Sequence, residues 1–151
     1  MSTSKIIQSH SVAVVGGGPA GLMAAEVLIQ GGVQVDLYDS MPSVGRKFLV
    51  AGKGGLNLTH AESREQFLSH YGTCRPQLEP LLDNFGPEDL RKWVHELGID
   101  TFVGTSGRVF PVGMKTFPIL HAWLLRLGKA GVSFHMHHKW FGWSNNGSLL
   151  F

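Results

Sequence analysis

The chain has 151 residues, of which 43% are hydrophobic and 16% charged, and its formal net charge is +2. These values describe an ordinary globular protein with room for a buried core, and exclude a disordered or fibrous one. Because the charge is small and no dense run of Lys and Arg occurs, we expect no nucleic-acid partner. No apolar run is long enough to span a membrane, and the single cysteine, Cys74, excludes an internal disulfide. We therefore expect a cytoplasmic protein that does not bind membranes.

The first elements in chain order are a strand, a helix and a second strand. Residues 11–15 form a short β-branched apolar run, which is typical of a strand buried on both faces. Residues 19–30 contain good helix formers and are followed by two glycines, which predicts a helix and its end. Residues 33–39 alternate between apolar and polar side chains, as a second strand does. The spacing is that of a right-handed, parallel βαβ unit over residues 11–39.

The rest of the chain begins with a glycine-rich segment, residues 45–59, which we predict to be a long functional loop because it has no helical or strand period. Helices are predicted over residues 87–97 and 118–130, each with a proline near its start and a glycine after its end. Residues 132–136 are a predicted strand. An Asn-Asn-Gly turn within residues 140–151 predicts a hairpin. The fold class is therefore α/β with a parallel core.

The glycines of residues 16–21, Gly-Gly-Gly-Pro-Ala-Gly, match the pattern G-x-G-x-x-G between the first strand and its helix. In this pattern the first glycine permits a tight turn, the second lets a pyrophosphate touch the main chain, and the third lets helix and strand pack closely. The helix start directs unpaired N–H groups and the positive end of its dipole at the phosphates. We therefore predict that a dinucleotide pyrophosphate is bound by Gly16, Gly18, Pro19, Ala20 and Gly21.

Asp39 closes the predicted second strand, 18 positions after Gly21. A carboxylate at this point can accept hydrogen bonds from a ribose and would repel a 2′-phosphate. The predicted ligand is therefore FAD or NAD, and the motif alone does not choose between them. The alternative is a glycine-rich turn with a coincidental aspartate, which the order of strand, glycines, helix, strand and acid disfavours.

Two later segments carry a resemblance to a known family. The segment GRKFLVAGKGGLNLTH, residues 45–60, resembles a signature written GRK…SGGGRCN, and residues 104–132 resemble a later GRVFP segment and its helix. With the glycine motif, they make the chain similar, over residues 12–143, to the BaiN-like or aminoacetone-oxidase-like family of FAD-dependent oxidoreductases. Where many members have Arg-Cys before the asparagine, this chain has Gly55-Leu56 before Asn57. No role of that cysteine is carried over.

The resemblance implies a Rossmann-like FAD/NAD(P)-binding fold and further cofactor contacts. Arg46 and Lys47 would contact phosphate or ribose, although exposed loop cations explain them nearly as well. The glycine-rich segment 45–59 would be a flavin-side loop, which passes near the ribityl chain and the isoalloxazine ring with Gly52, Gly54 and Asn57. Arg108, Phe110 and Pro111 would border the flavin or the substrate, or else belong to the core.

The resemblance also implies a longer protein, in which a substrate domain is inserted after the point where this sequence stops. We therefore expect residues 1–151 to be the N-terminal part of a FAD/NAD(P)-binding domain, with a mainly helical segment over residues 61–131 and a strand and hairpin over residues 132–151. The expected activity is that of a flavoprotein oxidoreductase acting on a small-molecule substrate at the flavin N5, with NAD(P)H as a possible electron donor. The alternative is a dinucleotide-binding module without turnover. No catalytic residue is assigned.

Three histidines, His135, His137 and His138, raise the question of a metal site. No carboxylate or cysteine accompanies them in the sequence, so we predict none. The four tryptophans are predicted to be core or interface residues rather than stacking platforms: Trp93, Trp123, Trp140 and Trp143.

Overall fold

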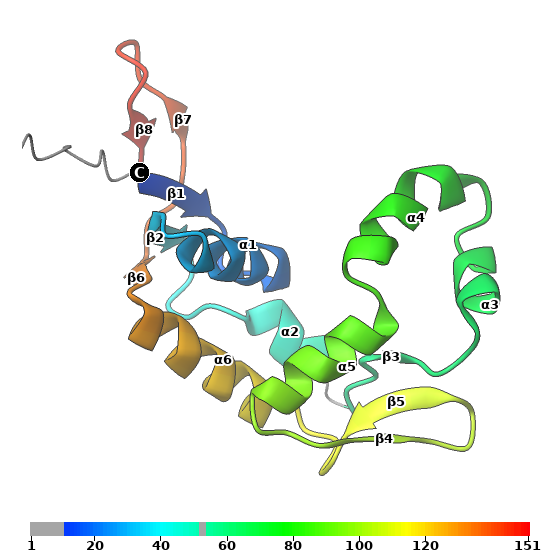
Figure 1. Ribbon diagram of the computed structural model, residues 1–151. Coiled ribbons are helices and arrows are strands. Elements are labelled where there is room, and N and C mark those ends of the chain that lie inside the picture. The colour runs from blue at the N-terminus through cyan, green and yellow to red at the C-terminus, as the bar shows by residue number, and fades with distance from the viewer. Residues whose placement is uncertain (1–10, 52–53) are drawn as a thin grey trace, which may run out of the picture. The chain divides into compact units, whose positions relative to one another are not determined.

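The structure of the protein is a computed structural model that describes residues 11–51 and 54–151 (Figure 1). Its contacts divide the chain into two compact units. The first unit consists of residues 1–48 and 124–151, and the second consists of residues 49–123. Within the described ranges, no helix combines the length and the apolar composition that a membrane crossing requires.

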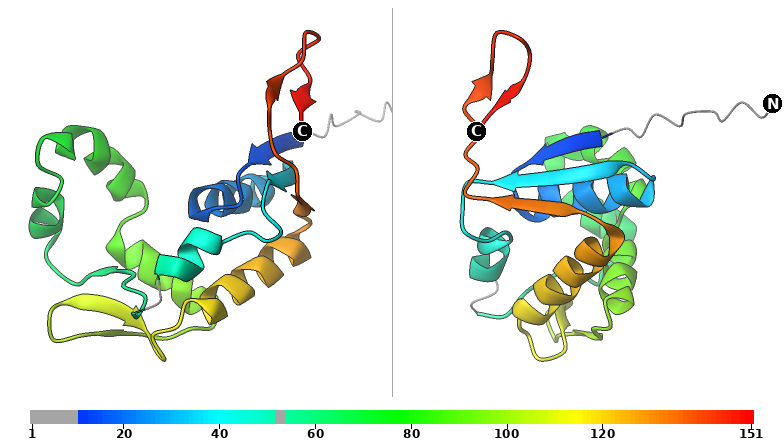
Figure 2. Two further views of the ribbon diagram at one scale, coloured as in Figure 1. Left: turned by 180° about the vertical axis from the view of Figure 1, so that it is seen from behind. Right: turned by 90° about the vertical axis from the view of Figure 1, so that its left-hand side faces the viewer.

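The first unit contains a three-stranded parallel sheet, made of β1 (Ser11–Val15), β2 (Gln34–Asp39) and β6 (Ser133–Met136). The strand order is β1-β2-β6, so β2 lies in the centre, as the right-hand view of Figure 2 shows. Helix α1 (Pro19–Gln30) joins β1 to β2. The predicted α/β class and the predicted βαβ unit are therefore confirmed, with nearly the predicted bounds.

The core of this unit lies between α1 and the central strand. Leu22 and Ala25 of α1 and Val35 and Leu37 of β2 are fully buried. Strand β1 is less buried than its apolar sequence predicts, since Val15 is 46% exposed. Within the described sheet β1 is an edge strand, paired with β2 alone, and one of its faces is open to solvent. The prediction of burial on both faces was therefore wrong.

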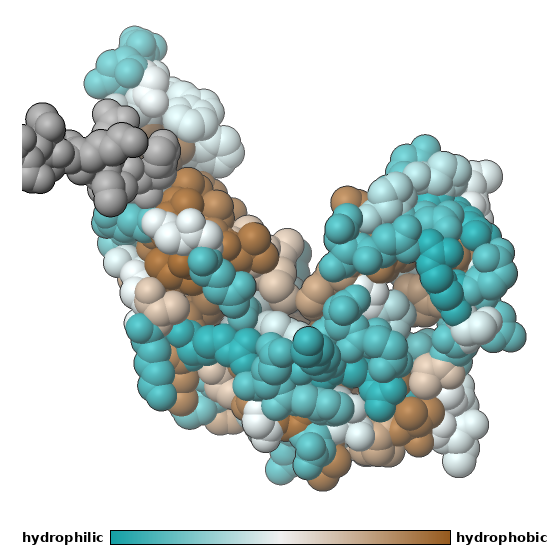
Figure 3. Space-filling model, viewed as in Figure 1, coloured by the Kyte–Doolittle hydropathy of each residue, from teal (hydrophilic) through white to brown (hydrophobic). Residues whose placement is uncertain are grey.

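Helix α1 is apolar nearly all round, and its one charged residue, Glu26, is buried. Its exposed side carries Ala20, Ala24 and Val27. The space-filling view shows this helix as a brown, hydrophobic area (Figure 3). Helices that are apolar all round are typically buried by other parts of a protein on several sides.

The predicted hairpin is present as the antiparallel pair β7 (Gly142–Trp143) and β8 (Leu149–Leu150). The ring of Phe151, directly after β8, stacks on Tyr38 of β2 with 4.2 Å between ring centroids. This stack connects the hairpin to the parallel sheet.

The second unit combines a small antiparallel sheet with helices. The sheet has the order β3-β5-β4. Its strands are β3 (Thr59–His60), β4 (Thr101–Val103) and β5 (Arg108–Pro111), and the helical elements are α3 (Arg64–Ser69), η1 (Gly72–Cys74), α4 (Arg75–Asn84) and α5 (Pro87–Glu96). Helix α6 (Phe117–Ala130) begins in this unit and ends in the first. Helices α5 and α6 were predicted; the sheet was not, so the segment 61–131 is less purely helical than expected.

A short helix, α2 (Arg46–Ala51), replaces the first part of the predicted loop over residues 45–59. The prediction of a loop was wrong there because six residues are too few to display a helical period. The helix follows Gly45, whose φ of 70° lies in the left-handed region. That conformation suits glycine because it lacks a Cβ atom.

The core of the second unit is built around two tryptophans. Trp93 of α5 and Trp123 of α6 meet edge to face at 4.7 Å between ring centroids, and both are buried. The prediction of core tryptophans is confirmed for this pair. Trp140 and Trp143, beside and in the hairpin, are instead 42% and 65% exposed.

Charged side chains link α3 to α4 in what we call the α3–α4 ion-pair network, made of Arg64, Glu65, Arg75, Glu79 and Asp83. Arg75 Nη1 lies 2.5 Å from Glu65 Oε1, and Arg75 Nε lies 3.1 Å from Glu79 Oε2. Arg64 Nη2 lies 2.8 Å from Glu79 Oε1 and 2.5 Å from Asp83 Oδ1. Glu79 therefore joins the two arginines.

Candidate functional site

The glycine motif forms the turn between β1 and α1. Gly16 leaves the strand with a φ of 104°, in the left-handed region, and its N–H donates to the Tyr38 carbonyl oxygen at 2.8 Å. Gly18 is the last residue before α1, in an extended conformation with φ −76° and ψ 177°. Pro19 is the first helical residue, where the missing N–H of proline removes no helical hydrogen bond.

The surroundings of Gly18 and Gly21 differ in the way the motif predicts. A Cβ atom on Gly21 would collide with the carbonyl oxygen of Gly16, so the close packing of helix and strand requires glycine there. A Cβ atom on Gly18 would meet no heavy atom within 4 Å. The main chain at Gly18 therefore faces open space, which a bound group could fill.

In the described part of the chain, the first turn of α1 has no capping side chain and no acidic residue of its own. The first N–H groups of a helix have no partner within the helix, and the dipole adds a partial positive charge there. This end of α1 is therefore suited to an anion such as a pyrophosphate.

Asp39, at the end of β2, lies directly beside the glycine turn. Its Oδ2 accepts a hydrogen bond from the Gly17 N–H at 2.6 Å, and its Oδ1 accepts one from the Met41 N–H at 2.8 Å. A carboxylate has about four acceptor positions, so both oxygens can accept further hydrogen bonds. The ribose contact of Asp39 stays a prediction. The contact to Gly17 was not predicted, because it joins residues 22 positions apart.

The turn after β6 completes the edge of the parallel sheet. The His138 N–H donates to the Asp39 carbonyl oxygen at 2.9 Å, and the His137 N–H donates to that of Met41 at 3.3 Å. His137 has a φ of 61°, an uncommon conformation for a residue other than glycine. The carboxyl ends of the three strands thus meet beside Gly17. In open α/β sheets, ligands bind at this edge.

The other predicted cofactor residues that the structure describes belong to α2 and to the second unit. Arg46 and Lys47 are exposed in the first turn of α2. Gly54 and the exposed Asn57 belong to the second unit. Gly52 lies outside the described residues.

The flavin-side loop is held against its own unit by main-chain hydrogen bonds. The Leu56 N–H donates to the Met114 carbonyl oxygen at 3.1 Å, and the Leu58 N–H donates to that of Val109 at 2.8 Å. In β5, Arg108 is exposed, Phe110 is half-buried and Pro111 is fully buried. Burial of Pro111 agrees with the core alternative for that residue.

The histidines of β6 have an acidic neighbour that the sequence did not reveal. His135 Nε2 lies 2.8 Å from Asp36 Oδ1 on the neighbouring strand. The statement that no carboxylate accompanies the histidines was wrong, because strand pairing brings together residues that are 99 positions apart. Within residues 11–51 and 54–151, no group of three or more His, Cys, Asp or Glu side chains is arranged to hold a metal ion.

A buried acid in α1 was also missed. Glu26 is 3% exposed, and its Oε1 accepts a hydrogen bond from Arg126 Nη1 of α6 at 3.0 Å. The side chain of Gln30 contributes a longer contact of 3.4 Å. No sequence pattern indicated the pair, since its members are 100 positions apart. Its place in the core of the first unit indicates a structural role.

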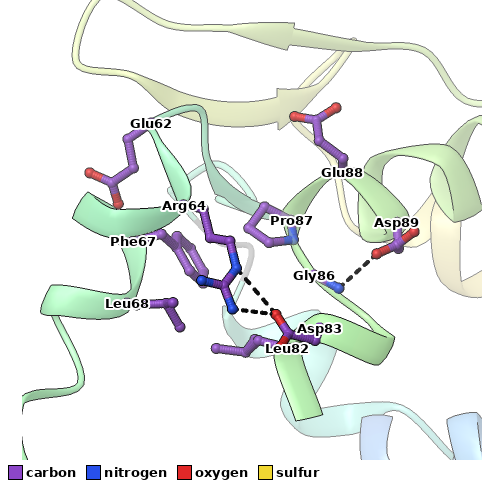
Figure 4. Close-up of a pocket in the computed structure, with 10 residues that line it drawn as sticks. All are labelled: Glu62, Arg64, Phe67, Leu68, Leu82, Asp83, Gly86, Pro87, Glu88 and Asp89. Atoms are coloured by element: carbon purple, nitrogen blue, oxygen red, sulfur yellow. Dashed lines mark hydrogen bonds and ion pairs between the residues drawn. The ribbon is translucent and has the colours of Figure 1, made fainter. Parts of the chain in front are cut away.

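The second unit contains a cavity of about 330 Å³ between α3, α4 and the start of α5 (Figure 4). Phe67, Leu82 and Pro87 supply apolar lining. The polar groups in it already bond to the protein: Arg64 pairs with Asp83, Asp89 accepts from the Gly86 N–H at 2.9 Å, and Glu88 pairs with Arg91 at 3.2 Å. The edge of the parallel sheet is therefore the better candidate site.

Comparison with known proteins identifies the family and the fold of the chain. A family model described as the HI0933-like protein Rossmann domain matches residues 10–151. A 43-residue stretch, 28% of this chain and 7% of the relative, is 51% identical to "Putative oxidoreductase UacF" of Escherichia coli K12. In structure the chain is similar to THI4 of Thermovibrio ammonificans, with a TM-score of 0.50, 17% identity and coverage of 93% of this chain and 45% of THI4.

A glycine oxidase of Bacillus cereus is similar with a TM-score of 0.46 and 14% identity, over 92% of this chain and 49% of the enzyme. The chain thus spans less than half the length of each of these relatives. The likeness to THI4 supports the fold. The match over residues 10–151 covers nearly the whole chain and confirms the resemblance found in the sequence. The chain belongs to the family of HI0933-like proteins, whose Rossmann-domain model residues 10–151 match.

Proposed function

We propose that the chain binds FAD at the carboxyl edge of its parallel sheet, as part of a flavoprotein oxidoreductase. The observation that carries the proposal is the uncapped N-terminus of α1 next to the open main chain at Gly18. A pyrophosphate supplies both the negative charge and the small size that this place accepts.

Different residues of the first unit would bind different parts of the cofactor. Gly16, Gly18, Pro19, Ala20 and Gly21 would surround the pyrophosphate, and Asp39 would bind the adenosine ribose. Because Asp39 also accepts from the Gly17 N–H, it would fix the position of the turn before the cofactor arrives. When bound, the flavin would supply the oxidation and reduction chemistry, and the protein would supply binding and orientation.

Further contacts are proposed on the resemblance to the family. Arg46 and Lys47 would lie near phosphate or ribose, and the flavin-side loop with Gly52, Gly54 and Asn57 would lie near the flavin. The resemblance also suggests NAD(P)H as electron donor and a small-molecule redox substrate. The name of the relative UacF agrees with an oxidoreductase.

A second candidate is a dinucleotide-binding module without turnover. The glycine turn and Asp39 would bind the ADP part of NAD as well as that of FAD, because both cofactors present the same ADP half. Titration of the purified chain with FAD, NAD and ADP shows which of these nucleotides the site prefers. FAD binding shifts the visible absorption band and quenches flavin fluorescence, whereas a preference for NAD would favour the second candidate.

The variant Gly18→Val tests the site itself. Its side chain enters open space and its backbone conformation is allowed for valine, so the variant should fold as the parent does. The same side chain would occupy the place of the pyrophosphate, so we expect the affinity for FAD and ADP to fall at least about tenfold, or 1.4 kcal/mol. Gly128→Val is the matched control, because a Cβ atom on Gly128 of α6 also meets no atom within 4 Å.

Each outcome of this test has a different meaning for the proposal. Loss of binding in Gly18→Val but not in Gly128→Val supports the site. Unchanged affinity in Gly18→Val, with both variants folded, would show that the nucleotide binds elsewhere. Failure of the parent chain to bind FAD, NAD and ADP would remove the proposed function of this chain altogether.

A further inference from the structure

Four aromatic rings meet on the open face of the parallel sheet. Side chains alternate along a strand, so Tyr38 lies on the face opposite to the buried Val35 and Leu37. The Tyr38 ring stacks on His135 with 4.5 Å between centroids and on Phe151 with 4.2 Å. It therefore lies in contact with a ring of the sheet and with the ring that follows the hairpin.

His138 is the fourth ring of this cluster, which we call the His–Tyr–Phe cluster (Tyr38, His135, His138 and Phe151). Its ring meets the other three edge to face, at centroid distances of 5.7 Å to Tyr38, 5.9 Å to His135 and 5.8 Å to Phe151. Its Nδ1 lies 2.8 Å from the Met136 carbonyl oxygen. Phe151, which follows the hairpin, thus contacts the sheet through Tyr38 and the turn after β6 through His138.

The cluster contains two histidines but, among the described residues, has one carboxylate side chain beside it. One carboxylate, Asp36, lies beside it, 2.8 Å from His135 Nε2. The residues of β1 on this face, Ser11, Ala13 and Val15, carry no charge, and neither does Ser133 of β6.

The remaining ionisable groups near the cluster do not supply a second negative side chain. His137 is an exposed imidazole on the same turn. Lys139 lies over the Phe141 ring at 5.4 Å from its centroid, and Asp39 points to the other face, where it accepts from Gly17. Within the described residues, Asp36 can therefore balance one imidazolium in the cluster but not two.

We propose that the His–Tyr–Phe cluster is a pH-sensitive latch, which holds the β7–β8 hairpin on the parallel sheet near neutral pH and releases it in acid. An imidazole that takes up a proton in acid carries a positive charge. A charge on His135 is balanced by Asp36, whereas no carboxylate side chain of the described residues lies beside His138 to balance a second charge. The charged His138 ring then moves into water, and the Tyr38–Phe151 stack loses a neighbour. A two-stranded hairpin is at most marginally stable alone, so it depends on such docking.

Nuclear magnetic resonance of the ¹⁵N-labelled chain tests the latch at about pH 8 and about pH 5, on either side of the imidazole titration. In acid, the order parameters of the hairpin amides should fall from about 0.85 to below about 0.6, while those of β2 remain high. The Phe151 ring signals should move toward those of a free phenylalanine. A hairpin that stays ordered in acid, or is already mobile at about pH 8, overturns the proposal.

His138→Gln is the deciding variant, because glutamine keeps a polar side chain but carries no charge in acid. The hairpin of this variant should stay ordered at about pH 5. If it is released there as in the parent, the proposal is overturned. If loss of the ring alone frees the hairpin near neutral pH, His138→Phe decides: an ordered hairpin in acid supports the latch, and a released one overturns it.

Two controls complete the experiment. His121→Gln removes an exposed histidine of α6 that stacks on Phe117, outside the cluster. The transition should be unchanged in this variant, and its disappearance would contradict the role of His138. A chain extended by Gly-Ser residues moves the α-carboxyl group away from Phe151. Release of the hairpin in acid should persist there, and its loss would assign the effect to that carboxyl group instead.

Discussion

The two units of the chain are stabilised by different kinds of contact. In the first unit, segments far apart in the sequence pair side by side in a parallel sheet, and main-chain groups meet main-chain groups around Gly16 and Gly17. In the second, helices near one another in the sequence are joined by charged side chains, of which Arg64 and Arg75 are the centres. We therefore expect added atoms at the glycine turn to destabilise the first unit, and expect acid and salt to weaken the ion pairs between α3 and α4 in the second unit.

Within the first unit, one glycine of the motif has a structural role and another is available for binding. Gly21 is required by the protein itself, because its place is filled by the main chain of Gly16, whereas Gly18 faces open space. Substitution of Gly21 should therefore destabilise the fold, whereas substitution of Gly18 should leave stability nearly unchanged and weaken nucleotide binding. The predictions below test this contrast and the contrast between the units.

The largest effect is expected for Gly21→Ala. The added methyl group meets the Gly16 carbonyl oxygen, which is main chain and cannot rotate away. We expect a loss of about 3 kcal/mol or more in the free energy of unfolding, or no folding at all. Urea denaturation followed by circular dichroism measures it. Gly18→Ala is the control and should change stability by less than about 0.5 kcal/mol; equal losses in both variants would refute the division of roles.

The next effect concerns the centre of the parallel sheet. Leu37→Ala removes a fully buried side chain from β2 and leaves a cavity, so we expect a loss of about 3 kcal/mol. The same substitution at Leu125 of α6, which is 50% exposed, should cost less than about 1 kcal/mol. If the two variants had the same denaturation midpoint, a core around Leu37 would be contradicted.

A smaller effect is expected for the pair between α1 and α6. Arg126→Ala removes the cation that donates to Glu26, a carboxylate that is 3% exposed in the parent. Because the Arg126 side chain is 27% exposed and partly screened by water, we expect a loss of about 1–2 kcal/mol. Lys129→Ala, on the exposed side of the same helix, should change the free energy of unfolding by less than about 0.5 kcal/mol. No difference between the two variants would show that the pair does not stabilise the unit.

The smallest effect is expected in the α3–α4 ion-pair network, and it depends on pH. Hydrogen bonds from Arg75 hold the pKa of Glu65 and of Glu79 below the ordinary value of 4.5, with Arg64 adding to the effect on Glu79. The network therefore stabilises the folded chain above about pH 4.5, and this contribution is lost as the pH falls through the lowered values.

Arg75→Gln should remove part of this dependence. The variant and the parent should differ slightly in denaturation midpoint at neutral pH and converge in acid, and added salt should also reduce the difference. Lys92→Gln, which removes an exposed lysine of α5 outside the network, serves as the control. A difference between Arg75→Gln and the parent that grows in acid would contradict the network.

Local patterns in the sequence predicted the elements of the first unit well. The βαβ unit could be recognised because a β-branched apolar run, β1, and a run of good helix formers, α1, are separated by glycines that only certain backbone turns require. The glycine motif then located the candidate site, since its spacing reflects the geometry of one main-chain turn. The structure adds to this the open space at Gly18 and the collision at Gly21.

Contacts between distant residues could not be predicted in this way. Asp39 with Gly17, Asp36 with His135 and Glu26 with Arg126 depend on which segments become neighbours after folding. The short strands of the antiparallel sheet were missed for a related reason. Two to four residues display no period, and their pairing partners decide their conformation.

Helix α1 has a practical consequence for handling the protein. Its exposed side offers water Ala20, Ala24 and Val27, and next to it β1 presents an edge of unpaired main-chain groups within the described sheet (Figure 3). Apolar surface beside an open strand edge promotes self-association. We expect light scattering by concentrated solutions to rise with concentration, and a lysine in place of Val27 to suppress it.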